Sequence, residues 1–170
     1  MKVVTTKSTL KTEVVASEDG MYRYLLKKDW SSKGKEKIIT IIMIQPSSSD
    51  IIELDMTTLY VINNVNEQGY NVVNIVNIFS SVTEEYMTDK VNDEYILKAV
   101  NEGEKVVWGV GNAGKYNKII QARVNEVVKL IDKHRVKVYV LTDSKSDVPR
   151  HPLSANVRLE WNLKSNINLN

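Results

Sequence analysis

The residues best suited to chemistry lie near the C-terminal end of the chain, in the run Pro149-Arg150-His151-Pro152-Leu153-Ser154. His151 is one of only two histidines in the chain, and two nearby prolines restrict the backbone on either side of it. An imidazole can donate and accept hydrogen bonds, and a simple connection between two elements does not need one held in this way. We therefore interpret the cluster as a functional site.

A second candidate is the glycine-rich run at residues 109–115, Gly-Val-Gly-Asn-Ala-Gly-Lys. It matches the G-x-G-x-x-G pattern of dinucleotide-binding loops and most of the G-x-x-x-x-G-K pattern of phosphate-binding loops. However, Tyr116 occupies the position of the magnesium-binding Ser or Thr, and neither Asp132 nor Asp143 falls at the end of the next strand, where a ribose-binding acid belongs. Nucleotide binding by Gly109 to Lys115, on a Rossmann-like fold, stays open as an alternative.

Length and composition set the class of protein. With 170 residues, 42% of them hydrophobic and 26% charged, the chain is expected to form a single domain over residues 1–170. It contains no cysteine, which excludes disulfides and thiolate metal sites and favours a cytoplasmic location. No apolar run approaches the ~20 residues that span a bilayer, so we expect no membrane partner. The net charge of +2 alone does not identify a nucleic-acid-binding protein.

Strand and helix patterns alternate along the chain. Runs rich in β-branched residues predict strands at residues 37–44, 71–79, 105–108 and 136–141, and helical spacing of apolar residues predicts helices at 55–66, 93–100 and 116–134. This alternation predicts an α/β fold, a three-layer α/β/α sandwich whose central sheet has four mostly parallel strands. An N-terminal β-hairpin around the turn at 17–20 precedes it, and we expect that hairpin to be peripheral.

A polar cluster follows each predicted strand. These clusters lie at residues 45–50, 77–81, 109–115 and 142–154. The carboxyl ends of parallel strands meet at one edge of the sheet, and ligands of such folds bind there. We therefore expect the four clusters to line one cleft.

The order and content of these clusters resemble the uracil-DNA glycosylase superfamily. Its members carry a first-strand motif ending in Asp-Pro or Asn-Pro, an Asn at the end of the next strand, a Trp-Gly strand end, and a closing His-Pro-Ser-Pro-Leu-Ser motif or a shortened form. The corresponding residues here are Ile44-Gln45-Pro46-Ser47, Asn77, Val107-Trp108-Gly109 and His151-Pro152-Leu153-Ser154. The chain also resembles uncharacterised bacterial and phage proteins with a Leu-Asn-Pro-Ser motif and a late His-Pro-Leu. The resemblance covers about residues 37–158 and implies a uracil-DNA glycosylase-like sandwich.

The resemblance implies a hydrolase that flips a nucleotide out of DNA and cleaves its N-glycosidic bond. His151 would donate a hydrogen bond to O2 of the departing base, where negative charge develops. The amide of Asn77 would read the acceptor O4 and the donor N3 of uracil, which cytosine does not offer. Pro46 and Ser47 would border the base, and Phe79 is the ring on which we expect it to stack.

Gln45 departs from the family pattern. Active relatives have Asp at this position to activate water, or Asn, whereas a glutamine can only position water through its carbonyl. We therefore expect slow excision, or the use of another carboxylate such as Asp50 or Asp143. Ser47 stands where the family has a tyrosine that excludes the thymine methyl group, so the substrate could be a modified pyrimidine.

The resemblance also implies contacts to DNA. Leu153 would fill the gap left by the flipped base, and polar or charged residues would hold the phosphate backbone. We assign backbone contacts to Ser48, Lys115, Arg150 and Ser154. The implied partners are uracil-containing DNA, single- or double-stranded, and a protein inhibitor of glycosylases, with no metal or other cofactor and with a monomer as the default.

Structural interpretations compete with these roles. His151 could order a surface loop, Asn77 could cap a strand end, and Leu153 could belong to the core. If Gln45 has ended catalysis, the chain is an inactive DNA-binding or decoy protein with the same fold. DNA repair, mobile DNA and defence are all compatible biological settings.

Overall fold

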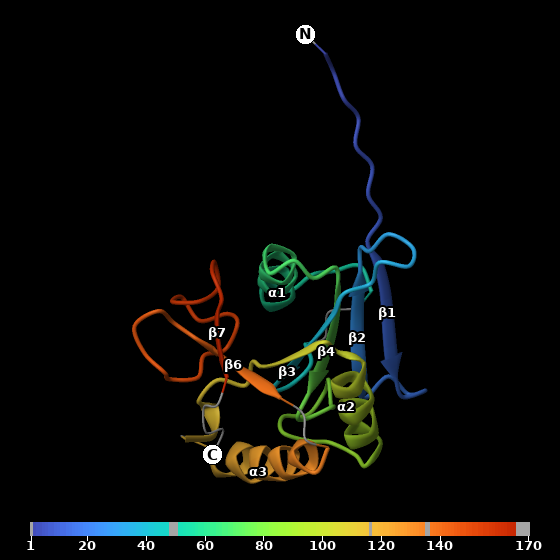
Figure 1. Ribbon diagram of the computed structural model, residues 1–170. Coiled ribbons are helices and arrows are strands. Elements are labelled where there is room, and N and C mark those ends of the chain that lie inside the picture. Colours follow the sequence, from blue (N-terminus) through green and yellow to red (C-terminus); the bar gives the residue numbers. More distant parts are fainter. Residues whose placement is uncertain (1, 48–50, 116, 135–136, 166–170) are drawn as a thin grey trace.

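The computed structural model describes residues 2–47, 51–115, 117–134 and 137–165. These residues form one seven-stranded mixed sheet with helices on both faces (Figure 1). The strand order across the sheet is β1-β2-β4-β3-β5-β6-β7. Along the chain the strands are β1 (Lys11–Ala16), β2 (Arg23–Asp29), β3 (Ile38–Met43), β4 (Val72–Asn77), β5 (Lys105–Trp108), β6 (Val138–Thr142) and β7 (Asn162–Ser165). The predicted α/β class is confirmed.

The four central strands, β4, β3, β5 and β6, are parallel to one another. They coincide with the four runs of β-branched residues that predicted strands. All residues of β4 are buried, as expected for a strand covered on both faces. In register, Met43 at the end of β3 stands beside Asn77 at the end of β4. The carboxyl ends of the central strands therefore meet at one edge of the sheet.

The sheet has three more strands than the four we expected. β1 and β2 form the predicted hairpin, but β2 also pairs antiparallel with β4, so the hairpin belongs to the sheet and is not peripheral. It is held there because Leu25 and Leu26 are buried in the cores on the two faces. On the other edge β7 pairs antiparallel with β6. Its sequence, Asn-Leu-Lys-Ser, lacks the β-branched alternation that predicts a strand.

Three helices cover the sheet, and their bounds are α1 (Met56–Glu67), α2 (Val91–Glu102) and α3 (Lys118–Asp132). α1 contributes Val61 and Val65 to the core on one face, whereas α2 and α3 contribute to the core on the other. A short 3-10 turn, η1 (Ala113–Lys115), precedes α3. Asp55 caps α1, as the sequence predicted, and Asn117 caps α3.

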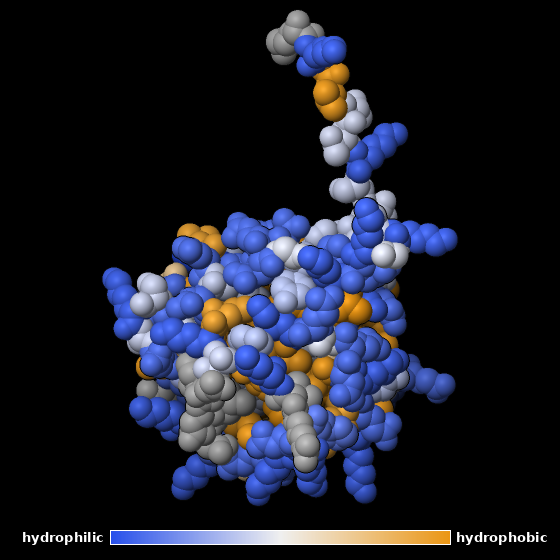
Figure 2. Space-filling view, viewed as in Figure 1, coloured by the Kyte–Doolittle hydropathy of each residue, from blue (hydrophilic) through white to orange (hydrophobic). Residues whose placement is uncertain are grey.

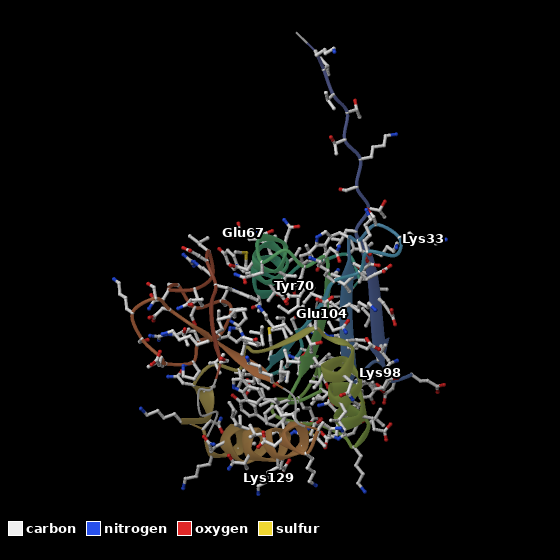
Figure 3. The ribbon with its side chains drawn as sticks, in the orientation of Figure 1. Lys33, Glu67, Tyr70, Lys98, Glu104 and Lys129 are labelled. Carbon is white, nitrogen blue, oxygen red and sulfur yellow. The ribbon has the colours of Figure 1, made fainter. Side chains whose placement is uncertain are left out.

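Charged and polar side chains cover most of the face shown in Figure 2, and residues 2–10 extend away from the body of the protein. The labelled charged residues on the helices, Glu67, Lys98 and Lys129, lie on the outer sides of α1, α2 and α3 (Figure 3). Within the described residues, no helix combines the length and the apolar character needed to cross a membrane.

Candidate functional site

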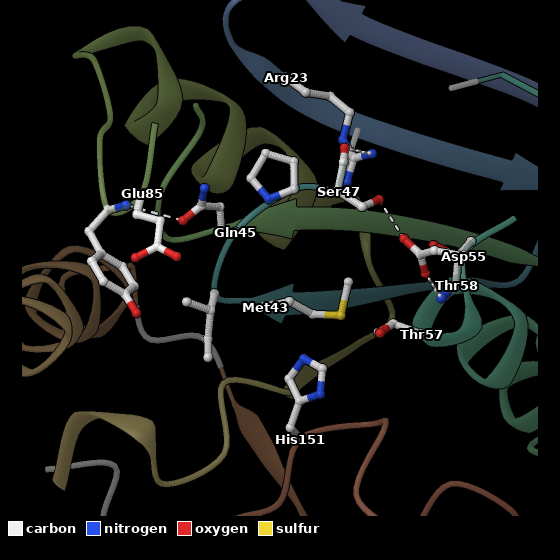
Figure 4. A pocket seen from close by; sticks show the side chains of 12 residues that line it. Arg23, Met43, Gln45, Ser47, Asp55, Thr57, Thr58, Glu85 and His151 are labelled. Carbon is white, nitrogen blue, oxygen red and sulfur yellow. Dashed lines mark hydrogen bonds between the residues drawn. The ribbon is translucent and has the colours of Figure 1, made fainter. Parts of the chain in front are cut away.

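A pocket of about 350 Å³ lies at the carboxyl ends of the central strands, which is a size typical of small-molecule sites (Figure 4). Five parts of the chain line it: Arg23 of β2, residues 43–47 at the end of β3, Asp55, Thr57 and Thr58 at the start of α1, the loop residues Glu85 and Tyr86, and His151. The predicted site residues Gln45, Pro46, Ser47 and His151 are therefore brought together.

His151 is half-buried in this pocket, and its ring has a defined orientation. The backbone N–H of Leu153 donates a hydrogen bond to Nδ1 of His151 at 3.2 Å. An accepting Nδ1 carries no proton, so the neutral ring has its N–H at Nε2. Burial lowers the pKa of His151 below 6.5, and the negative charge of Asp55 opposes this shift only in part. The pocket therefore contains an uncharged imidazole with one N–H donor.

The glycine-rich run supports the loop that carries His151. Gly111 has a φ of +68°, and a Cβ there would lie 2.9 Å from the backbone nitrogen of His151. A Cβ on Gly109 would lie 3.3 Å from Cδ of Pro152. Gly111 is needed because the backbone of the His151 loop passes directly against it, whereas Gly109 packs against the Ile42 carbonyl oxygen and the Pro152 ring. Close packing therefore explains why glycine occurs at positions 109 and 111. None of residues 109–115 lines the pocket.

Gln45 holds the loop on the other side of the pocket. Its Nε2 donates to the carbonyl oxygen of Glu84 at 3.2 Å, and its Oε1 accepts from the backbone N–H of Tyr86 at 3.1 Å. Tyr86 has a φ of +58°, an uncommon conformation for a bulky residue that often marks functional sites. Both ends of the Gln45 amide are thus used to fix the backbone that carries Glu85 and Tyr86.

One end of the pocket is formed by three polar residues that contact one another. Ser47 donates a hydrogen bond through its hydroxyl to the carboxylate of Asp55, which also accepts from the backbone N–H of Thr58 at 2.6 Å. Arg23 donates to the carbonyl oxygen of Ser47 at 3.4 Å. Burial lowers the pKa of Arg23 to about 10, with Asp55 acting in the opposite direction. Arg23 is therefore a buried cation at neutral pH.

Asn77 and Phe79 do not line the pocket. Asn77 is 1% exposed, and because it stands beside Met43 in parallel register it shares the sheet face of that pocket-lining residue. Its Nδ2 has no hydrogen-bond partner among the described residues, which is uncommon for a buried amide. Phe79 is buried in the core under α2 and α3, where its ring packs edge-on against Tyr86. The aromatic ring that borders the pocket is that of Tyr86.

The remaining predicted site residues lie outside the pocket lining. Arg150 forms an ion pair with Asp143 at 2.9 Å, and hydrogen bonds, above all from the backbone N–H of Lys145, lower the pKa of Asp143 to about 2. Leu153 is 42% exposed, so it is not part of the core. Ser154 follows it, with its backbone N–H bonded to the carbonyl of His151, and Lys115 is exposed at the end of η1. Ser48 and Asp50 lie outside the described residues.

Among the pocket residues that sequence reasoning did not assign to the site, those with charged or aromatic side chains are Arg23, Asp55, Glu85 and Tyr86. Asp55 was identified only as a helix cap, and Arg23 lies on a strand that was expected to be peripheral. Glu85 and Tyr86 belong to a polar segment without periodicity. The one available signal was the position of Asp55, a capping carboxylate five residues after the end of the first polar cluster, because a residue so close in the sequence had to lie near that cluster.

The described residues contain no group of three or more His, Asp or Glu side chains placed to hold a metal ion. The site therefore consists of an imidazole, a guanidinium, two carboxylates and several hydroxyls at the carboxyl edge of an α/β sheet. In folds of this class, ligands bind at that edge of the sheet.

The chain belongs to a family defined only as proteins of unknown function, DUF1643, whose model matches residues 23–153. The match begins at Arg23 and ends two residues after His151, so it includes every pocket-lining residue. It excludes β1 and β7. No curated protein and no solved structure shows a significant match to the chain.

Proposed function

We propose that this protein is a DNA glycosylase that hydrolyses the N-glycosidic bond of uracil, or of a related modified pyrimidine, in flipped-out nucleotides of DNA. The observation that carries the proposal is the state of His151. It is a neutral imidazole, fixed by the Leu153 N–H, in the same pocket as Gln45, Pro46 and Ser47. The resemblance of the four sequence motifs to uracil-DNA glycosylases supports the same reaction.

In this reaction His151 donates its Nε2–H to O2 of the base, which becomes negatively charged as the glycosidic bond breaks. A fixed donor of this kind stabilises developing charge without reorganising during the reaction. We assign the reading of the O4 and N3 edge to the amide of Asn77, whose Nδ2 has no partner among the described residues and is the donor that O4 requires. Because Asn77 is 1% exposed and lies outside the pocket lining, this role requires the side chains between it and the pocket to move when the base binds. Tyr86 supplies the ring that stacks on the base in place of Phe79.

A water molecule must replace the base on the sugar, and a carboxylate in the pocket is the natural group to orient it and take its proton. Asp55 already accepts hydrogen bonds from Ser47 and Thr58. Glu85 is exposed, and its carboxylate has no hydrogen-bond or ion-pair partner among the described residues. We assign the water to Glu85, and Gln45 positions the loop that carries it.

This assignment predicts that Gln45→Glu will slow excision although it adds a carboxylate. A glutamate can accept from the Tyr86 N–H but cannot donate to the Glu84 carbonyl, which would then face a carboxylate oxygen. Losing one such hydrogen bond costs about 1 kcal/mol, and the excision rate should fall about tenfold because the Glu85 loop shifts. Single-turnover rates on a uracil oligonucleotide measure this effect. A faster variant would show that Gln45 occupies the position of the general base.

Contacts with DNA come from the surface around the pocket. Leu153 is the exposed apolar side chain two residues after His151 and fills the gap in the base stack. Arg150, Lys115, Ser154 and Ser48 contact the phosphate backbone. In this proposal the protein acts as a monomer and its substrate is uracil-containing DNA. A protein inhibitor of glycosylases would bind the same surface.

The test uses purified protein with single- and double-stranded oligonucleotides that contain one uracil, in buffer with EDTA. Alkali then converts each abasic site into a strand break. We expect slow cleavage at the uracil position, impaired in His151→Ala and in Asn77→Ala. Tight binding without cleavage would instead identify an inactive DNA-binding protein. A thermal shift with NAD or ATP but not with DNA would identify a nucleotide-binding protein.

A further inference from the structure

Residues 2–10, which we call the arm, continue from β1 and extend away from the body of the protein (Figures 1 and 2). Val3 and Val4 are 85% and 83% exposed, and within the described part of the chain residues 2–9 form no hydrogen bond or ion pair. Five of the eight residues at positions 3–10 are Val or Thr, a composition that favours a β-strand. A strand needs a neighbouring strand to satisfy its backbone groups, so we expect the arm to pair with one.

The arm cannot fold back onto β1 of its own chain. It runs directly into β1, and residues 2–16 contain no Gly, Pro, Asn or Asp with which to form a turn. β1 lies at one end of the strand order, beside β2 alone, so its other edge is open among the described strands. An open edge without proline is a template for a strand of another molecule. The edge of β1 in a second copy is therefore the natural partner of the arm.

The charges on this strand select a register for two copies that pair antiparallel. Lys7 and Glu13 are exposed and have no partner among the described residues, whereas Lys11 already bonds to Asp29 of β2 at 3.4 Å. If the two-fold axis passes at Leu10, Lys7 of each copy lies directly opposite Glu13 of the other. Opposite charges in directly opposed positions stabilise a pair of strands. In this register the arm of one copy lies along β1 of the other.

The same register covers an apolar groove beside the edge of the sheet. The groove has a volume of about 290 Å³ and is lined by Leu10, Thr12, Lys28, Ile51, Ile52 and Leu54. Its apolar side chains are unusually open to solvent: Leu10 is 46% exposed, Ile51 57% and Ile52 86%. With Leu10 at the two-fold axis, Leu10 of the second copy lies against this groove. Pairing of the strands therefore also removes exposed apolar surface from water.

We propose that β1 and the arm form a homodimer interface, in which two copies pair antiparallel around Leu10 and join their sheets into one. None of the residues that line the pocket belongs to β1 or to the arm, so each copy keeps a complete site. The monomer of the proposed function is then the catalytic unit, and the dimer is the state in solution. The inference does not depend on glycosylase activity.

Sedimentation equilibrium of the full chain tests the interface. We expect a mass twice the 19.4 kDa of one chain, in reversible equilibrium with the monomer. Thr5→Pro/Thr6→Pro removes two backbone donors from the arm and should raise the dissociation constant at least about tenfold. Thr5→Ala/Thr6→Ala is the matched control, because it keeps both N–H groups, and its dissociation constant should stay within about threefold of wild type. Both residues are exposed, so neither change should alter unfolding of the monomer.

Single cysteines test the register, since the chain has no cysteine of its own. Leu10→Cys brings two thiols together at the two-fold axis, and a mild oxidant should link most of the protein into a covalent dimer. Val3→Cys is the control. The two thiols of that variant lie roughly 45 Å apart in the proposed dimer, at about 3.3 Å per residue, and should not link.

The outcomes decide the inference without reference to excision. A wild-type protein that stays monomeric at about 100 times the concentration used for activity assays overturns it, and loss of DNA binding by the proline variant of such a monomer would assign the arm to DNA. A dimer that the two prolines leave unchanged uses another surface, which also overturns the inference. Equal linking of Leu10→Cys and Val3→Cys would show that the register is wrong.

Discussion

Replacing His151 with alanine is expected to slow uracil excision by a factor of about 10²–10³, the usual effect of removing one donor that stabilises developing negative charge. The one hydrogen bond to the ring within the described part of the chain comes from Leu153 of the same loop, so no bond to another element is lost and the variant should fold normally. Single-turnover rates measure the loss, and the unfolding midpoint serves as the control. A variant with near wild-type excision would remove His151 from the reaction.

The same residue gives the reaction a defined pH dependence. Burial holds the pKa of His151 below 6.5, so the ring is neutral at pH 7. Protonation turns Nδ1 into a donor, and Nδ1 then no longer accepts the Leu153 N–H that orients the ring. We expect the excision rate to stay level from about pH 8 down to pH 6.5 and to fall at lower pH as the ring protonates.

The lowered pKa of His151 also makes the free energy of unfolding decrease as the pH falls. The unfolded chain binds a proton at His151 near pH 6.5, before the folded protein does, because the folded-state pKa is lower. Its contribution to stability is therefore complete above pH 6.5 and is lost as the pH falls toward the folded-state pKa. His151→Gln should reduce this acid destabilisation, and urea unfolding at several pH values measures the difference.

The central fold was predictable because its signals are local. Continuous β-branched runs identified the four parallel strands, and helical spacing with an Asp55 cap identified α1 within one residue of its start. The two sheet edges were not predictable in the same way. β7 has no strand pattern, and whether the β1–β2 hairpin joins the sheet depends on pairing with β4, a contact far away in the sequence.

The site was predictable where it depended on topology alone. Residues 45–47 and His151 meet because parallel strands bring their carboxyl ends to one edge. Phe79 illustrates where this reasoning stops. β4 ends at Asn77, so the alternation of side chains does not continue, and Phe79 enters the core under α2 and α3. Arg23 reaches the pocket only through the pairing of β2 with β4.

The glycines of residues 109–115 match a phosphate-binding pattern, but the contacts around them give a different reason for their presence. The spacing of Gly109, Gly111 and Gly114 matches a phosphate-binding pattern, yet Gly109 packs against the Ile42 carbonyl and the Pro152 ring, and Gly111 packs against the His151 backbone. The N-terminus of α3 is capped by Asn117, whose side chain accepts from the N–H groups of Ile119 and Ile120. These backbone donors are therefore already bonded, and the run shapes the loop of the candidate site.

Gly111→Ala is accordingly expected to reduce excision about 100-fold, although Gly111 does not line the pocket. A Cβ at this position would lie 2.9 Å from the His151 backbone nitrogen and 3.2 Å from the Arg150 carbonyl carbon, so the loop has to move. A displacement of ~1 Å in a catalytic group is enough for a loss of this size. The left-handed backbone adds a strain of about 1–2 kcal/mol, measurable by urea unfolding.

Gly34→Ala is the matched control for this prediction. Gly34 has a φ of +74°, close to the +68° of Gly111, and a Cβ there would meet nothing within 4 Å. Both variants carry the same backbone strain and should lose similar stability, but Gly111→Ala alone displaces His151. Equal excision rates in the two variants would show that the contact with His151 has no catalytic consequence. A selective loss in Gly111→Ala would establish the glycine-rich run as the support of the catalytic loop.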